Sequence, residues 1–221
     1  MNNKKPIYKK IGFVLTHPKV YLNLFYYHIK VFIEKVKGID FTKIEQAPAL
    51  NLVGTPNNGY WSSNNKFLRN GLNSLNLDVQ KSIIDIGCGK GEVLIAFNKY
   101  GFKNVAGIEL TVKLYNIAKS NISKLKLDNI KIYNENAIEF DYYEKYNYFY
   151  LYNPFHSEVM RPVIDKIEST LITQPRNIII IYKNPVCHDE IIKNKIFELK
   201  REFPTEIKGI SFYIYANFNL S

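Results

Sequence analysis

From residue 81 onward, short runs of β-branched and other apolar residues alternate with longer stretches in which apolar positions recur at helical spacing. This alternation is typical of βαβ units and predicts a doubly wound α/β fold with a mostly parallel sheet. The run Asn177–Tyr182 contains four consecutive isoleucines, as expected of a strand buried on both faces. The expected strands are Ser82–Ile86, Asn104–Glu109, Ile130–Tyr133, Tyr148–Tyr152, Asn177–Tyr182 and Ile210–Asn217, the last of them an antiparallel edge strand. The expected helices between them are Gly91–Tyr100, Val112–Lys126, Glu158–Leu171 and Asp189–Lys200.

Two further segments precede this regular pattern. Val20–Val36 has enough apolar positions for a helix, and Pro18 stands just before it, where proline tolerates a helix start. Residues 41–75 are rich in loop residues, with a turn cluster at 55–59 and a helix expected at Asn65–Leu75. We therefore divide the chain into a basic, helical N-terminal extension (1–40), a covering loop and helix (41–80) and an α/β domain (81–221).

Positive charge is concentrated in the N-terminal extension. The chain carries a net charge of +10, and residues 1–39 hold eight lysines against the single acid Glu34, which accounts for +7. A basic arm of this kind can bind phosphates or an anionic membrane surface, or it can equally be a solvated tail. A helix such as the expected one most often packs on its own domain, and docking to a membrane surface is the alternative. The lysines are Lys4, Lys5, Lys9, Lys10, Lys19, Lys30, Lys35 and Lys37.

Cysteine content and hydropathy narrow the class of protein. Cys88 and Cys187 cannot form a disulfide framework, and no Cys/His spacing indicates a metal site, so a reducing compartment is the default. We find no signal peptide and no apolar run approaching the roughly 20 residues that span a bilayer. The sequence therefore predicts a cytoplasmic protein, either soluble or peripheral to the inner membrane face.

The most informative motif is Asp85-Ile86-Gly87-Cys88-Gly89-Lys90-Gly91, which links an expected strand to an expected helix. Glycines in such a turn let the backbone fold tightly and let a ligand lie against it without a Cβ in the way. A dinucleotide fingerprint would place its third glycine at position 92, where this chain has Glu92, an anion that would repel a pyrophosphate. Asp85 also favours a cationic ligand, so the dinucleotide interpretation is rejected.

A second element supports a nucleoside-containing ligand. Glu109 ends the second expected strand, 24 residues after Asp85, where a carboxylate can accept hydrogen bonds from ribose hydroxyls. With this D-x-G-x-G-x-G element and Glu109, residues 80–217 resemble the class I S-adenosylmethionine-dependent methyltransferases, which implies a Rossmann-like fold of the seven-stranded type. The resemblance implies that S-adenosyl-L-methionine is the cofactor. The cofactor-binding residues that it implies are Asp85, Gly87, Gly89 and Gly91 for the methionine part, Glu109 for the ribose, and Leu110, Asn136 and Ala137 for the adenine.

The fourth expected strand ends in Asn153-Pro154-Phe155-His156, which we take as the candidate catalytic segment. It resembles the Asn-Pro-Pro-Tyr/Phe element of amino-methyltransferases, although one proline is missing. In that element the asparagine side chain and a proline carbonyl accept amine hydrogens, and the aromatic ring stacks on the planar group. His156 is a candidate base for an acceptor that must lose a proton. A group of small bacterial methyltransferases is similar in both motifs, in Asn184-Pro185, and in an upstream loop tyrosine that corresponds to Tyr60.

Three functions remain open at this stage. The first is methylation of a small molecule, glycan or protein side chain, with nitrogen suggested as the acceptor atom. The second is nucleic-acid N-methylation, favoured by the net charge of +10 and by abundant aromatic residues for base stacking. The third is a non-catalytic protein that binds S-adenosylmethionine, against which the intact glycine motif and Glu109 argue. Nothing in the sequence indicates the acceptor or the oligomeric state.

Overall fold

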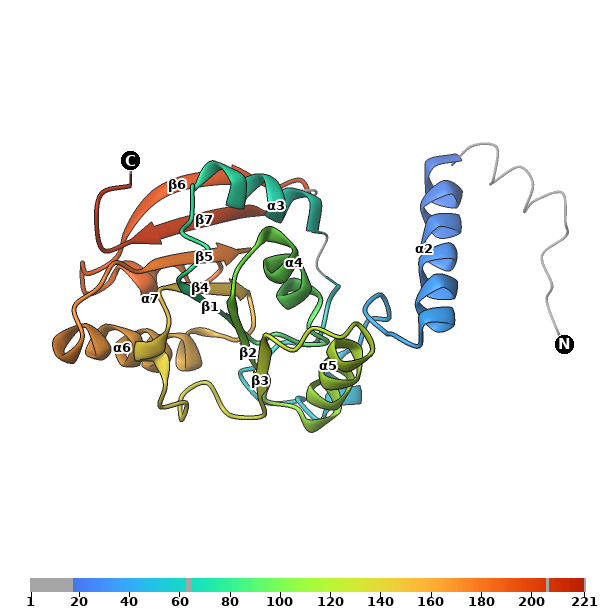
Figure 1. Ribbon diagram of the computed structural model, residues 1–221, viewed down its shortest axis with the longest axis horizontal. Helices are drawn as coiled ribbons and strands as arrows, with labels where there is room; N and C mark the ends of the chain where they lie inside the picture. Colours follow the sequence, from blue (N-terminus) through green and yellow to red (C-terminus); the bar gives the residue numbers. More distant parts are fainter. Residues whose placement is uncertain (1–17, 63–64, 206, 221) are drawn as a thin grey trace, which may run out of the picture.

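In the computed structural model, which describes residues 18–62, 65–205 and 207–220, a seven-stranded sheet forms the centre of the molecule (Figure 1). The strand order is β3-β2-β1-β4-β5-β7-β6. Five neighbouring strands are parallel, whereas β7 pairs antiparallel with both β5 and β6. The predicted doubly wound, mostly parallel α/β fold is thereby confirmed. The strands are β1 (Ser82–Ile86), β2 (Asn104–Ile108), β3 (Ile130–Tyr133), β4 (Tyr148–Tyr152), β5 (Ile179–Lys183), β6 (Glu198–Pro204) and β7 (Ser211–Ala216).

Helices cover both faces of the sheet, and one helix stands apart from it (Figure 1). The described helices are α2 (Pro18–Lys37), α3 (Asn65–Ser74), α4 (Glu92–Tyr100), α5 (Val112–Lys124), α6 (Ser157–Thr173) and α7 (His188–Ile192), with short 3-10 helices η1 (Ala47–Leu50) and η2 (Tyr143–Lys145). Within the described ranges, no helix combines the length and apolar character needed to cross a membrane.

Alternation along the central strands builds one apolar layer on each face of the sheet. In β1, Ile83 packs in the layer that contains Leu94 and Phe97 of α4. Its neighbour Ile84 packs in the opposite layer with Val163 of α6. Because successive side chains of a strand point to opposite faces, a strand covered on both sides is apolar along most of its length, as in β5, where Ile179, Ile180 and Ile181 are all buried.

The strand order reverses between β1 and β4, which lie side by side at the centre of the sheet. The chain leaves these two neighbours toward opposite edges, and this leaves a crevice beyond their carboxyl ends. The residues that follow β1, β2 and β4 therefore meet at one place, which is where the sequence motifs fall.

The expectation of a helix at Asp189–Lys200 is wrong beyond its first turns. Helix α7 ends at Ile192, Lys195 adopts a left-handed conformation with φ +58°, and residues 198–204 form strand β6. The charged sequence of β6 suits a helix locally, but pairing with β7 outweighs that propensity, and charged side chains are also typical of edge strands. As a consequence β7 is antiparallel, as predicted, but β6 is the edge strand in its place.

The N-terminal helix α2 does not pack its apolar side chains on the α/β domain. Residues 22–30 are all exposed, including Phe25, whose exposed fraction is 61%. The expectation that this helix packs on its own domain is therefore wrong for its apolar side. Lys4, Lys5, Lys9 and Lys10 of the predicted basic arm lie outside the described residues.

Candidate functional site

A cavity of about 420 Å³ opens at the carboxyl ends of β1, β2 and β4. This size suits a drug-sized or cofactor-sized ligand, and the position is the one expected for ligands of doubly wound sheets. Two of the candidate residues, Gly91 and His156, lie outside the lining. The candidates that line the cavity are Tyr60, Asp85, Gly87, Gly89, Glu109, Leu110, Asn136, Ala137, Asn153, Pro154 and Phe155.

The glycine turn after β1 folds back on the end of β2. The backbone amides of Gly87 and Cys88 both donate to the carbonyl of Ile108 at 2.9 Å. Gly89 has φ +55°, and a Cβ there would lie 2.4 Å from the ring of Tyr60, so both the backbone conformation and the space require glycine. Gly91 has φ +82° and faces Ala118 and Ile122 of α5. It is the N-cap residue of α4, at the point where the turn ends.

Two buried carboxylates face the cavity. Asp85 is 2% exposed and Glu109 is 6% exposed. Burial, followed by the negative charge of Glu109, raises the pKa of Asp85 well above its usual range. Among the described residues, neither carboxylate forms an ion pair with a lysine or arginine. A cavity with two buried acids and no paired cation on its wall favours a positively charged ligand.

Glu109 is held in place by three hydrogen bonds. Its carboxylate accepts from the Gly89 amide at 3.0 Å, and from the amide and hydroxyl of Thr111 at 2.8 Å each. Burial raises the pKa of Glu109, and these donors counteract that rise. An ionised carboxylate offers about four acceptor sites, so room remains for one more donor, such as a sugar hydroxyl.

Sequence reasoning did not identify how residues 40–62, here called the cover segment, close over the candidate catalytic segment. The Asn58 side chain donates to the carbonyl of Asn153 at 2.8 Å, and its backbone amide donates to the carbonyl of Pro154 at 2.9 Å. The amide of His156 donates to the carbonyl of Pro56 at 2.8 Å. Asn57, Asn58 and Trp61 consequently line the cavity, and the turn cluster at 55–59 was the signal in the sequence.

Lys90, inside the glycine motif, anchors the other end of the cover segment. Its side chain is 0% exposed, and its ammonium group lies 2.9 Å from both carboxylate oxygens of Asp40 and 2.7 Å from the carbonyl of Lys43. The same ammonium group lies 5.2 Å from the ring centroid of Tyr60. The hydroxyl of Tyr60 in turn donates to the carbonyl of Phe41 at 2.6 Å.

The end of the cavity beyond β3 combines apolar and amide groups. Leu110 is half-exposed there, and Ala137 is buried. The side-chain oxygen of Asn136 accepts from the amide of Ile138 at 3.1 Å, which orients the asparagine in its turn. Glu135 also lines the cavity and supplies a carboxylate beside Asn136 that the sequence reasoning passed over.

The candidate catalytic segment divides into residues that face the cavity and one that does not. Asn153 adopts φ +40°, which directs it into the lining, and the hydroxyl of Tyr182 donates to its side-chain oxygen at 3.4 Å. Phe155 is 4% exposed within the lining, whereas His156 is the residue before α6 and its side chain is exposed. In the Asn-Pro-Pro-Tyr/Phe element a proline carbonyl accepts an amine hydrogen of the acceptor. Here the carbonyl of Pro154 already accepts a hydrogen bond from the backbone amide of Asn58.

Cys88 lines the cavity but is poorly suited to nucleophilic chemistry. The thiol is buried, and burial together with Asp85 and Glu109 raises its pKa well above the usual range. A Cβ at Gly107 would lie 2.7 Å from the Cys88 sulfur, so the cysteine fills the space that this glycine leaves open. Its role in the turn is packing.

Comparison with known proteins agrees with this geometry. A protein family described as "Methyltransferase domain" matches residues 77–209. The fold is similar to that of a SAM-dependent methyltransferase from Aquifex aeolicus, with a TM-score of 0.54 and 18% identity over 66% of this chain and 87% of that one. It is also similar to an RNA methyltransferase from Salinibacter ruber, solved with S-adenosyl-L-homocysteine, with a TM-score of 0.50 and 16% identity over 72% and 99% of the two chains.

A local match in sequence is found with EEF1A lysine methyltransferase 2 of Homo sapiens, which is 36% identical over 56 residues. This match covers 25% of the present chain and spans about a quarter of the human protein, 24% of its length. The match to the family covers more than half of the chain, and the chain therefore belongs to the methyltransferase-domain family. S-adenosyl-L-methionine is the cofactor that this family and this fold indicate.

Proposed function

We propose that the protein binds S-adenosyl-L-methionine in the 420 Å³ cavity and transfers its methyl group to an acceptor presented beside Asn153. The observation that carries this proposal is the pair of buried carboxylates, Asp85 and Glu109, which face the cavity without a cationic partner among the described residues. The cofactor carries positive charge on its sulfonium and amino groups and no phosphate. It therefore suits this wall better than a dinucleotide does.

The residues proposed to bind the methionine part, the ribose and the adenine lie at the carboxyl ends of the neighbouring strands β1, β2 and β3. Asp85 and the turn at Gly87 and Gly89 would hold the charged methionine part, where the backbone is open. The remaining acceptor site of Glu109 would receive a ribose hydroxyl. Leu110, Asn136 and Ala137 would surround the adenine, with Glu135 as a further acceptor for its amino group.

Nitrogen is the acceptor atom that the candidate catalytic segment favours. The Asn153 side chain lies at the carboxyl end of β4 and offers an amide oxygen to an amine hydrogen. Phe155 presents an aromatic ring in the same wall, on which a planar group can stack. The sulfonium of the cofactor is already an activated leaving group, so alignment of the acceptor and exclusion of water supply most of the rate.

Three acceptor classes fit this site: a small molecule, a glycan or a protein side chain. A nucleic acid is the alternative, and the net charge of +10 favours it. Against the alternative, residues 1–39 account for +7 of that charge, which leaves only +3 for the rest of the chain.

Transfer of a labelled methyl group separates these acceptors. The protein is incubated with methyl-labelled S-adenosylmethionine and a cell extract, and the protein, nucleic-acid, glycan and small-molecule fractions are counted. We expect label in a fraction other than nucleic acid, lost with Asp85→Ala and kept with the control Asp141→Ala, which changes a carboxylate that pairs with Lys166 outside the cavity. Label that ribonuclease or deoxyribonuclease releases would establish the alternative, and no labelled fraction would contradict methyl transfer.

A further inference from the structure

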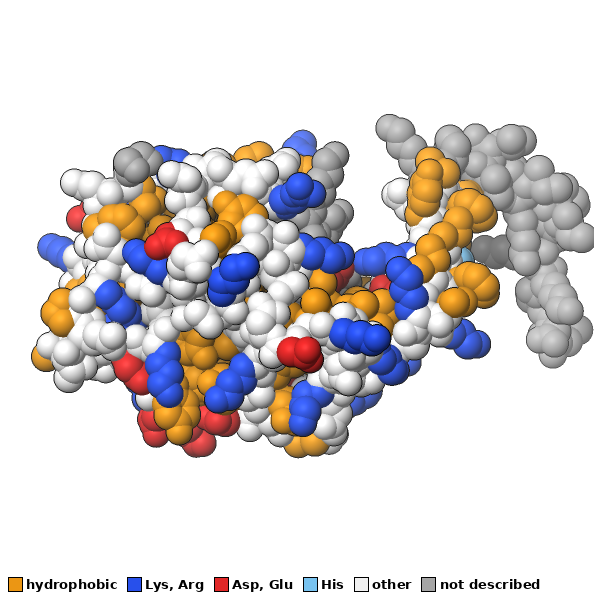
Figure 2. Space-filling model, in the orientation of Figure 1, with side chains coloured by type: hydrophobic (Ala, Val, Ile, Leu, Met, Phe, Trp, Pro, Cys, Tyr) orange, Lys and Arg blue, Asp and Glu red, His pale blue; other side chains and the backbone are white. Residues whose placement is uncertain are grey.

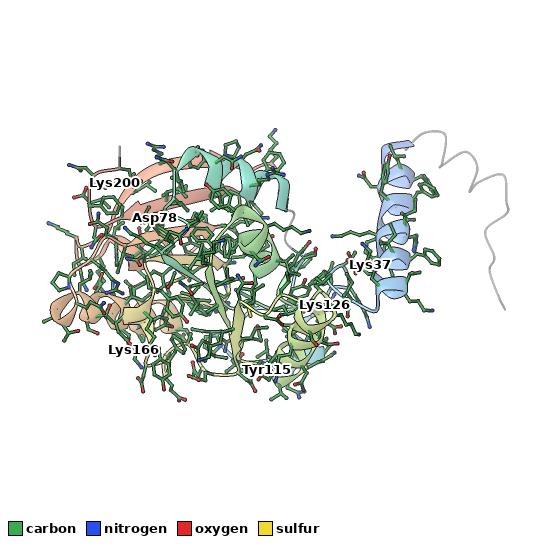
Figure 3. All side chains as sticks on the ribbon, in the orientation of Figure 1. Lys37, Asp78, Tyr115, Lys126, Lys166 and Lys200 are labelled. Atoms are coloured by element: carbon green, nitrogen blue, oxygen red, sulfur yellow. The ribbon has the colours of Figure 1, made fainter. Side chains whose placement is uncertain are left out.

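Helix α2 exposes an apolar face that nothing in the described structure covers. Its large side chains are open to solvent, with exposed fractions of 61% for Phe25, 66% for Phe32 and 71% for Val36. Figure 2 shows hydrophobic side chains gathered along this helix, and Figure 3 shows its side chains extending outward, with Lys37 at the end nearest the domain. An exposed apolar face of this kind marks an interaction surface.

The polar side of α2 is the side that attaches to the domain. Glu34 is buried, and its carboxylate accepts from the amides of Phe41 and Thr42 at 3.1 and 3.0 Å and from the Thr42 hydroxyl at 2.6 Å. Lys30 lies 3.4 Å from a carboxylate oxygen of Glu92 at the start of α4. Residues 30 and 34 lie about 40° apart around a helix, so both contacts use one side.

The apolar residues form a separate stripe. They recur at spacings of three and four residues and span about 100° of the helix, centred roughly 130° from the side that holds Lys30 and Glu34. The attachment to the domain therefore turns the stripe outward. The residues of the stripe, here called the apolar face, are Leu22, Phe25, Ile29, Phe32, Ile33 and Val36.

The lysines beside the apolar face of α2 indicate which kind of partner this face binds. Lys37 borders the apolar face on one side, and Lys35 and His28 border it on the other. Lysines that flank an apolar stripe keep their ammonium groups at the level of lipid phosphates while the stripe enters the acyl boundary. A second copy of the chain would bring these lysines together. The one acid of the described helix, Glu34, is already engaged by three hydrogen bonds and cannot neutralise them.

We propose that α2 binds an anionic membrane surface, lying along the interface with its apolar face toward the lipid. The domain then stays on the aqueous side, because Lys30 and Glu34 hold it to the opposite side of the helix. This inference is independent of methyl transfer, since it rests on α2 and its attachment to the domain and not on cofactor or acceptor binding.

Vesicle binding tests the proposal with two leucines as a matched pair. Leu22 in the apolar face is 51% exposed, and Leu24, about 160° away around the helix, is 49% exposed. The full chain is sedimented with vesicles of phosphatidylcholine alone or with a third phosphatidylserine. We expect at least about tenfold tighter binding to the anionic vesicles, weakened by 0.5 M salt. Leu22→Ser should weaken that binding about tenfold and Leu24→Ser less than about threefold.

Both variants should stay folded, because both side chains are exposed. Circular dichroism and thermal unfolding check this. Equal binding to neutral and anionic vesicles, or equal effects of the two substitutions, would overturn the proposal. A concentration-dependent dimer that Leu22→Ser abolishes and vesicles do not compete with would also overturn it, because the face would then bind a second copy.

Discussion

The ammonium group of Lys90 lies 2.9 Å from each carboxylate oxygen of Asp40, joining the glycine turn after β1 to the cover segment 50 residues earlier in the chain. The lysine is fully buried and has two acidic neighbours: Asp40, which is 39% exposed, and Glu45, which is 7% exposed and lies 3.7 Å away. Tyr60, which lies against Gly89 and under the same ammonium group, is thereby tied to the turn that the cofactor is expected to contact. The cover segment and the glycine turn of the cofactor site are therefore connected through Lys90 and Tyr60.

Replacing Lys90 by methionine should weaken the connection between the cover segment and the glycine turn. The substitution leaves Asp40 and the carbonyl of Lys43 without their donor, and we expect a loss of about 2 kcal/mol in the free energy of unfolding, less than for a fully buried pair because Asp40 is partly solvated. Affinity for S-adenosylmethionine should fall about tenfold. Denaturant unfolding and calorimetry measure the two effects.

Lys113→Met is the matched control for this prediction. Lys113 also binds a carboxylate of the cover segment, with its ammonium group 2.7 Å from Glu45, but its side chain is 47% exposed. The loss should stay below about 1 kcal/mol, because the Lys113 ammonium group is largely solvated and the buried Glu45 keeps Lys90 3.7 Å away. Equal losses for the two lysines would contradict a special role of the buried one.

Gly89→Ala should damage the site, and Gly71→Ala should not. A Cβ at Gly89 would collide with the Tyr60 ring, and φ is +55°, so we expect a loss of about 2–4 kcal/mol in stability and no detectable cofactor binding. Gly71 lies in α3 with no atom within 4 Å of an added Cβ, and alanine there should stabilise the helix by about 0.5–1 kcal/mol. Thermal unfolding with and without S-adenosylhomocysteine checks both outcomes.

The buried pair Asp85 and Glu109 predicts how stability depends on pH. Burial raises the pKa of both carboxyls, so between about pH 4 and those raised values the folded state binds more protons than the unfolded state. Stability without cofactor should therefore fall as pH rises through that window. Asp85→Asn removes one of the two groups and should be more stable than the wild type, by a margin that grows from pH 5 to pH 8. A margin independent of pH in denaturant unfolding would show that Asp85 titrates normally.

Cofactor binding should release protons for the same reason. A cation beside Asp85 favours its ionised form and lowers its pKa toward the ordinary range. Calorimetry in two buffers with different ionisation enthalpies should therefore give different observed binding enthalpies near neutral pH. Identical enthalpies in the two buffers would indicate that the ligand does not approach the carboxylates.

Asn153 and His156 should differ sharply in their effect on turnover. Asn153 lines the cavity, whereas His156 is exposed and contributes its backbone amide to the bond with Pro56. We expect Asn153→Ala to lower the rate of labelled methyl transfer on the order of 100-fold and His156→Ala to change it less than about twofold. Cofactor affinity should change little in both. A large effect of His156→Ala would restore it as a catalytic base.

Local patterns predicted the centre of the parallel sheet because strands β1, β4 and β5 are mostly buried and consist largely of apolar residues. Asp85 lies near the end of β1 and Glu109 follows β2 directly, and neighbouring parallel strands bring their ends together, so the strand pattern alone places both carboxylates at one edge of the sheet. Gly91 and His156 lie outside the lining although their segments reach it, because Gly91 faces α5 and His156 stands at the start of α6.

Long-range pairing accounts for what the sequence did not reveal. Strand β6 is charged and reads locally as a helix, and its conformation is decided by β7. The bonds from Asn58 to residues 153 and 154, and from Lys90 to Asp40, join segments that carry no common periodicity. Such contacts form only when segments far apart in the sequence are brought together in the folded chain.

The most direct test of the account is calorimetric titration of the protein with S-adenosylmethionine and S-adenosylhomocysteine, in parallel with Asp85→Ala, Glu109→Ala and the control Asp141→Ala. We expect micromolar binding by the wild type and by the control, and at least about tenfold weaker binding by the other two variants. Absence of binding by the wild type, or binding that neither Asp85→Ala nor Glu109→Ala weakens, would contradict it.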